Sequence, residues 1–278
     1  MRGRKTVVTA VRRPDGSLAV DAQSLPALYS GWLRQTPLVR GIIALVEALS
    51  LGLKALLYSA NVSLEEEGEK VSGGMAWVMV VFSLALGVGL FFIAPLFLTR
   101  LFHLKSPLVF NLVDGVIRVA IFIAYLKLMS LIPDIRRVFS YHGAEHKTVN
   151  AYEAGVPLEV DAVKKYSTAH TRCGTSFLFV VMIISIVVFG MIGLRAIWLM
   201  VLSRVVLIPV IAALSYEFIY LAARYSHNVL MKVVLAPGLW LQSLTTREPD
   251  DSQLEVAITA LRKVIEAEQP VGVVQTVS

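Results

Sequence analysis

Long apolar stretches without charged residues dominate the middle of the chain. Residues 75–99 and 174–194 contain no Asp, Glu, Lys or Arg, and each is long enough to cross a bilayer as a helix. Residues 108–132, which follow Pro107, and residues 196–222 are apolar over a similar length. The pattern therefore predicts about four membrane-spanning helices.

Two other apolar segments are not predicted to span the membrane. Residues 38–59 are interrupted by Glu47 and Lys54, which share one helix face because seven residues separate them. This pattern predicts an amphipathic helix that lies in the membrane interface rather than one that spans the bilayer. Residues 229–244 contain a Pro-Gly pair and are too short to span comfortably. We expect them to form an interfacial or re-entrant segment.

The polar ends of the chain carry two further elements. Residues 5–21 form two short β-branched runs around the turn Pro14-Asp15-Gly16, which predicts a β-hairpin. Because an isolated hairpin is marginally stable, we expect it to lean on another element. After Asp250 and Asp251, apolar residues recur at helical spacing, which predicts a soluble C-terminal helix. The expected fold class is mainly α, a polytopic helical membrane protein with a short N-terminal hairpin.

These elements divide the chain into six expected segments. They are an N-terminal cytosolic segment with the hairpin (1–37), the interfacial helix (38–59), a first pair of spanning helices (75–133), a cytosolic loop (134–173), a second pair of spanning helices (174–222), and an interfacial segment with the C-terminal cytosolic helix (223–278).

Composition and charge agree with a membrane protein. The chain is 56% hydrophobic and only 17% charged, against about 25% charged in average soluble domains. The net charge of +6 comes without a basic patch interleaved with aromatic residues, so we expect no nucleic-acid partner. Residues 1–40 hold seven Lys or Arg and residues 134–173 hold six, whereas residues 100–107 hold two. The positive-inside rule therefore places both termini and the 134–173 loop in the cytosol, at a bacterial cytoplasmic membrane.

The 134–173 loop contains the motif YHGAEHK at residues 141–147. Pro133-Asp134 and Gly155 favour a helix over residues 135–154. On that helix His142 and His146 lie one turn apart, with Glu145 on nearly the same arc. This H-x-x-E-H spacing lets two imidazoles bind one metal while a carboxylate stands beside it.

Further metal ligands follow in the same loop. His170 and Cys173, the chain's single cysteine, lie three residues apart at the start of a spanning segment. A cytosolic thiol stays reduced and can bind metal as thiolate. We therefore expect zinc at His142, His146, His170 and Cys173. Four protein ligands would make the site structural, whereas three and an open position, with Glu145 as base, would make it catalytic.

Polar residues also occur inside the apolar segments. Asp114 and Arg118 lie four residues apart, which indicates an ion pair within the membrane that fixes helix packing. Glu217 is unpaired within its own predicted helix. We interpret it as structural, with a second catalytic carboxylate as the alternative.

Several motifs together resemble the YqhQ family of bacterial multi-spanning membrane proteins. They are MRGRK at 1–5, RGIIALVE at 40–47, YHGAEHK at 141–147, HTRCGTS at 170–176 and LWLQSLTTREPDD at 239–251. The family is described as predicted metal-dependent enzymes. The resemblance implies a site that includes Arg172 beside the histidines, Glu145 and Cys173.

Three functions are compatible with these features. A membrane metallohydrolase would use Glu145 as the base and Arg172 to stabilise the developing oxyanion on a membrane-associated substrate. A zinc-stabilised scaffold would instead assist membrane-protein biogenesis or quality-control machinery. An ion transporter using Asp114 and Glu217 is the weakest of the three, because the histidines lie outside the predicted spans.

Overall fold

In the computed structural model, residues 1–65, 73–170, 173–193, 196–225 and 228–268 are described. The first half contains the strands β1 and β2 and the helices that follow them: β1 Thr6–Arg12, β2 Leu18–Ser24, α1 Ala27–Ser30, the 3-10 helix η1 Trp32–Gln35, α2 Val39–Ser63, α3 Gly73–Val88, the π-helical turn η3 Gly89–Ile93, α4 Ala94–Arg100 and α5 Pro107–Met129. The described part of the second half contains seven helices: α6 Pro133–Glu153, α7 Val160–Val163, α8 Gly174–Ile192, α9 Ile197–Val206, α10 Ile208–Arg224, α11 Val229–Thr245 and α12 Asp251–Glu268.

The chain is mainly helical, and four of its helices are long and apolar enough to cross a membrane: Val39–Ser63, Gly73–Arg100, Pro107–Met129 and Gly174–Ile192. The last three confirm three of the predicted spans. The first is the segment predicted to be interfacial. Length and composition therefore allow α2 to cross, and its interfacial placement remains a prediction.

The predicted span over residues 196–222 is not one continuous helix, although its two parts together are long and apolar enough for a broken span or a re-entrant loop. It is broken into α9 and α10, whose axes differ by 49°. Pro209 explains the break, because proline lacks the N–H that a continuous helix needs and disfavours helical backbone at the residue before it.

The predicted N-terminal hairpin and C-terminal helix are both confirmed, and the two elements pack against each other. β1 and β2 pair antiparallel from Thr6–Ser24 to Arg12–Leu18, and Gly16 turns the chain at a φ of +86° that glycine adopts without strain. Val8 packs on Ala260 and Val264 of α12. The hairpin thus gains from α12 the support that two isolated strands lack.

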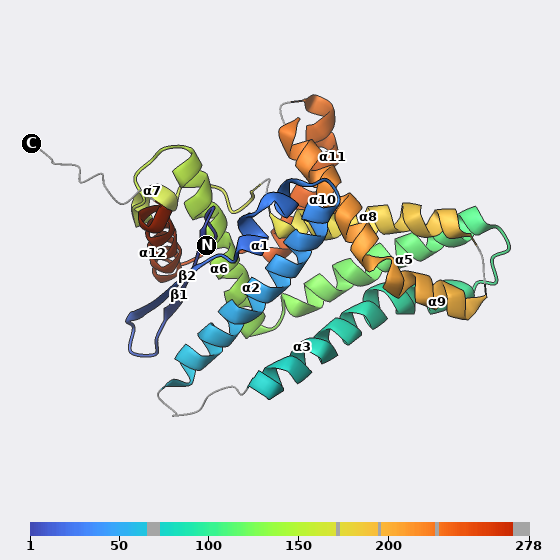
Figure 1. The fold of residues 1–278 in the computed structure, drawn as a ribbon, viewed down its shortest axis with the longest axis horizontal. Coiled ribbons are helices and arrows are strands. Elements are labelled where there is room, and N and C mark those ends of the chain that lie inside the picture. The colour runs from blue at the N-terminus through green and yellow to red at the C-terminus, as the bar shows by residue number, and fades with distance from the viewer. Residues whose placement is uncertain (66–72, 171–172, 194–195, 226–227, 269–278) are drawn as a thin grey trace, which may run out of the picture.

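α12 joins the hairpin to α6, and the three gather at one end of the molecule (Figure 1). Its other apolar face packs on α6 and α7 through a core that contains Ala144, Ala151, Val163, Leu254 and Ile258. The connection between α4 and α5 lies at the opposite end (Figure 1).

This packing limits which helices can cross a membrane. The hairpin precedes α2 and α6 follows α5, yet both contact α12. If the hairpin, α12 and α6 lie together in water, as the sequence predicts, they lie on the same side of a bilayer, and the chain between them crosses it an even number of times. Three helices that could span lie in that interval, namely α2, α3 with α4, and α5. An interfacial α2 satisfies this parity, which supports the prediction made from Glu47 and Lys54.

Candidate metal centre

The helix α6 carries two of the predicted ligands. It begins with Pro133 in its first turn, where the missing N–H costs nothing, and Asp134 complements the helix dipole there. Gly155 follows its end with a φ of +71°. The predicted helix is therefore confirmed, and the rings of His142 and His146 lie one turn apart with centroids separated by 4.4 Å.

Cys173 approaches these histidines from the start of α8. It is the N-cap residue of that helix, and its Sγ accepts a hydrogen bond from the Thr175 N–H at 3.4 Å. Its Sγ lies 3.3 Å from His142 Nε2. One ligand atom each from His142, His146 and Cys173 all lie within 4.8 Å of one another. The cluster could hold a metal ion.

Backbone carbonyls orient both imidazoles. His142 Nδ1 lies 2.9 Å from the Thr245 carbonyl oxygen, and His146 Nδ1 lies 2.6 Å from that of Thr168. A carbonyl only accepts, so each Nδ1 carries a hydrogen, and in the neutral form of the ring each Nε2 keeps its lone pair for a metal. Such carbonyl partners commonly fix metal-binding histidines.

The ligand types of the cluster suit zinc, and one of its interatomic distances has the size that zinc requires, while all three ligand atoms lie within 4.8 Å of one another. Zinc bonds of about 2.0–2.3 Å in a tetrahedron place neighbouring ligand atoms about 3.3–3.6 Å apart. The 3.3 Å between Cys173 Sγ and His142 Nε2 is close to that spacing. Imidazole nitrogen and thiolate sulfur are also ligands that zinc prefers to magnesium or calcium.

Electrostatics favour the thiolate form of Cys173. Burial raises the pKa of its thiol, but hydrogen bonds with His142, His146 and Thr175 outweigh burial and bring the pKa to about 5. Burial lowers the pKa of His142, whereas hydrogen bonds to Cys173 and the Thr245 carbonyl, with the charges of Cys173 and Glu145, raise it overall. The thiolate is the form that binds metals.

Two residues outside the predicted set hold the site together. Gly143 permits close contact between α6 and the end of α11, because a Cβ there would lie 2.1 Å from the Arg247 carbonyl oxygen. The buried Gln242 accepts from the His170 N–H at 2.9 Å and donates to the His170 carbonyl at 2.8 Å. The sequence analysis assigned no role to Gly143, Gln242 or Thr245. Gly143 lies in the motif at 141–147, and Gln242 and Thr245 lie in the motif at 239–251, so the motifs of the family resemblance were the available signal.

The other predicted residues lie around the cluster. His170 is beside it, with its ring centroid 5.8 Å from that of His146 and its Nε2 3.4 Å from Glu153 Oε2. Its role as a fourth ligand remains a prediction. Glu145 is exposed on α6. Arg172 lies outside the described residues, so its role also remains a prediction.

The predicted ion pair between Asp114 and Arg118 is confirmed, at 2.6 Å with both side chains buried. Sequence reasoning missed its third member, Arg204 of α9, which lies 3.3 Å from the same carboxylate. Glu217 pairs with Arg40 of α2 at 2.7 Å. This ion pair supports a structural role for Glu217 rather than that of a second catalytic carboxylate.

Comparison with known proteins places the chain in a family. The family described as "Protein of unknown function (DUF1385)" matches residues 36–267. The chain is 35% identical over 286 residues to the "Uncharacterized protein YqhQ" of Bacillus subtilis (strain 168), with 96% of this chain and 89% of the relative covered. No solved structure matches. The match across nearly the whole length of both chains shows that the protein belongs to the YqhQ family.

Proposed function

We propose that the protein is a zinc-dependent hydrolase of a bacterial cytoplasmic membrane, with its site facing the cytosol and acting on a peptide bond of a membrane-associated substrate. The observation that carries the proposal is the cluster of three nitrogen and sulfur ligands, His142, His146 and Cys173. Three protein ligands leave one position of a tetrahedral shell open, which is typical of catalytic rather than structural zinc.

Each residue around the cluster can have a separate role in hydrolysis. Zinc bound there would supply a Lewis acid that makes water nucleophilic near neutral pH. Glu145 would take the proton from the attacking water at its carboxylate, since its charge acts on His142 from the adjacent helical turn. Arg172 would stabilise the negative charge that develops on the substrate oxygen. The carbonyls of Thr245 and Thr168 would keep both imidazoles in the tautomer that binds metal.

The contact between Cys173 and His142 also fits a cysteine nucleophile activated by a histidine. The second histidine argues for a metal instead. His146 brings its own oriented Nε2 to the same sulfur, whereas a cysteine nucleophile needs one imidazole as its base. Zinc content separates the two chemistries.

A zinc-stabilised scaffold for membrane-protein biogenesis or quality control is the second candidate. One feature favours it: the cluster joins segments that are distant in the chain. His142 on α6 contacts Cys173 at the start of α8 and Thr245 at the end of α11. A fourth bond from His170 would close the shell and make the metal a cross-link.

Glu145→Gln separates the hydrolase from the scaffold. Glutamine keeps the shape and most of the hydrogen bonding of glutamate but cannot act as the base. We expect the variant to retain zinc, measured by elemental analysis of the purified protein. We also expect it not to complement a deletion strain, and its failure should be as complete as that of His146→Ala. The matched control is Asp134→Asn in the exposed first turn of the same helix, which should complement fully.

A zinc-loaded Glu145→Gln protein that complements fully would refute the hydrolase and favour the scaffold. In that case Glu145 would only orient a ligand, and its loss would lower zinc affinity by about 10–100-fold at most. A wild-type protein without any transition metal, even after zinc loading, would refute both proposals and favour the cysteine nucleophile.

A further inference from the structure

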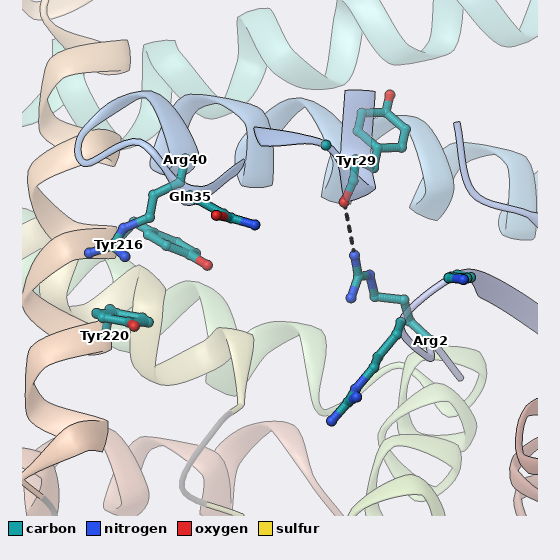
Figure 2. Close-up of a pocket in the computed structure, with 9 residues that line it drawn as sticks. Arg2, Tyr29, Gln35, Arg40, Tyr216 and Tyr220 are labelled. Carbon is teal, nitrogen blue, oxygen red and sulfur yellow. Dashed lines mark hydrogen bonds between the residues drawn. The ribbon is translucent and has the colours of Figure 1, made fainter. Parts of the chain in front are cut away.

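A cavity of about 630 Å³ opens where the N-terminal residues meet α1, η1, α2 and α10 (Figure 2). Its volume is in the range of small-molecule sites, about 300–1,000 Å³. Basic and hydroxyl-bearing side chains dominate the lining, which shares no residue with the metal cluster. The basic residues of the lining are Arg2, Arg4, Lys5 and Arg40, and its tyrosines are Tyr29, Tyr216 and Tyr220.

Two of the four basic residues already have carboxylate partners. Arg2 Nε lies 2.7 Å from Glu47 Oε1, and Arg40 forms an ion pair with Glu217. These pairs hold the two guanidinium groups in place. Arg40 also stacks on Tyr220, with its Cζ 3.8 Å from the ring centroid. Figure 2 shows Arg40, Tyr216 and Tyr220 on one side of the cavity and Arg2 on the other.

The other two basic residues leave the cavity with an excess of positive charge. In the described part of the chain, the Arg4 and Lys5 side chains have no carboxylate within ion-pair distance. One further carboxylate lies nearby, that of Glu268, which accepts a hydrogen bond from the Lys5 backbone N–H at 2.8 Å. Even when Glu268 is counted with the two paired carboxylates, the four cations exceed the three anions.

The donor set is suited to phosphate. Guanidinium groups bind phosphate oxygens through paired N–H donors, and lysine adds a mobile charge. Tyr216 and Tyr220 supply hydroxyl donors from α10. The guanidinium groups of Arg2 and Arg40 are fixed on opposite sides of the cavity. Together with the side chains of Arg4 and Lys5, they can contact a bound anion from several directions.

The position of the cavity suggests where the anion comes from. Arg40 is the second residue of α2, an apolar helix that either crosses the bilayer or lies in its interface. The cavity therefore lies at the level of the lipid headgroups, where anionic phospholipids attract basic side chains. We propose that this cavity binds a net-anionic phosphate ester, which can be the headgroup of an anionic phospholipid or a soluble phosphate compound.

Titration calorimetry of the full chain in uncharged detergent micelles tests the proposal. The probes are dihexanoylphosphatidylglycerol, dihexanoylphosphatidylcholine, glycerol phosphate and inorganic phosphate. We expect the phosphatidylglycerol to bind and the zwitterionic phosphatidylcholine not to bind. Binding of phosphatidylglycerol alone identifies a lipid headgroup. Binding of the soluble phosphates, with displacement of phosphatidylglycerol from the wild-type protein, identifies phosphate recognition that does not need the lipid.

The variant Arg4→Gln with Lys5→Gln should weaken binding by about 10-fold or more, because it removes two charged donors. It breaks no ion pair, so the fold should persist. The matched control is Arg137→Gln with Lys165→Gln, two exposed cations outside the cavity.

Equal losses in both double variants would overturn the proposal, because they would show attraction to net charge alone. Equal binding of the two lipids, or no binding of any probe to the wild-type chain, would also overturn it. The proposal is independent of the metal centre, so His146→Ala should bind the probes like the wild type whether or not the hydrolase proposal holds.

Discussion

Asp114→Asn should strongly destabilise the membrane part of the protein. The Asp114 carboxylate lies 2.6 Å from Arg118 and 3.3 Å from Arg204, and all three side chains are at most 2% exposed. Arg118 also donates a hydrogen bond to Ser185 of α8, so the cluster joins α5, α8 and α9. Asparagine removes the single negative charge and leaves two buried guanidiniums without a counter-charge.

The size of the effect follows from this imbalance. Removing one partner of a buried ion pair costs about 3–5 kcal/mol, because the remaining charge cannot be solvated. Asparagine keeps one acceptor oxygen, so we expect a loss near the lower end of that range. In the described residues, the Nε atoms of Arg118 and Arg204 have no hydrogen-bond partner. These two donors already lack an acceptor, so the loss of a carboxylate oxygen adds to an existing shortage of acceptors there.

Arg204→Met is the informative comparison. It removes the excess positive charge, leaves Asp114 paired with Arg118, and keeps an apolar side chain of similar length beside Phe189, over which Arg204 now stacks. We expect this change to cost clearly less than Asp114→Asn, because it leaves no buried charge without a counter-charge. The assay is reversible unfolding in mixed micelles with increasing dodecyl sulfate. An Asp114→Asn loss under about 1 kcal/mol, or an equal loss in Arg204→Met, would refute the reasoning.

Three further predictions follow from the water-facing part. Gly143→Ala should lower zinc affinity by about 10-fold or more, measured by competition with a chelator, because its methyl would collide with the Arg247 carbonyl and displace the segment whose Thr245 carbonyl orients His142. Asp250→Ala should cost about 1 kcal/mol, since Asp250 accepts from the backbone N–H three residues on at 2.8 Å as an N-cap. Hydrogen bonding to a serine hydroxyl lowers the pKa of Asp250. Its contribution to the free energy of unfolding is therefore present above about pH 4 and lost as the pH falls through the lowered pKa. Thermal unfolding across pH should show the variant less stable near neutral pH and equal to the wild type in acid. A cysteine placed at Lys164 in a Cys173→Ser background should resist an impermeant thiol reagent on intact cells and react after lysis, and labelling of intact cells would reverse the proposed orientation.

Much of the local structure followed from periodicity along the chain. The long apolar runs, two of them free of charge, predicted three spanning helices at nearly the observed bounds, and the turn at Pro14-Asp15-Gly16 predicted the hairpin. The one-turn spacing of His142 and His146 predicted two imidazoles on one helix face. These features depend on neighbours within a few residues, so the sequence specifies them by itself.

Contacts between distant segments were decided only by the tertiary structure. Glu217 is paired with Arg40, 177 residues away, and Asp114 gained Arg204 as a partner 90 residues later. The carbonyl that orients His142 belongs to Thr245 on another helix. The local sequence does not predict the distant partner of a charged group or a carbonyl. That partner depends on which helix faces pack together and at what angle. The bend between α9 and α10 brings Arg204 and Glu217 to different neighbours, and only the packed arrangement of helices fixes those pairings.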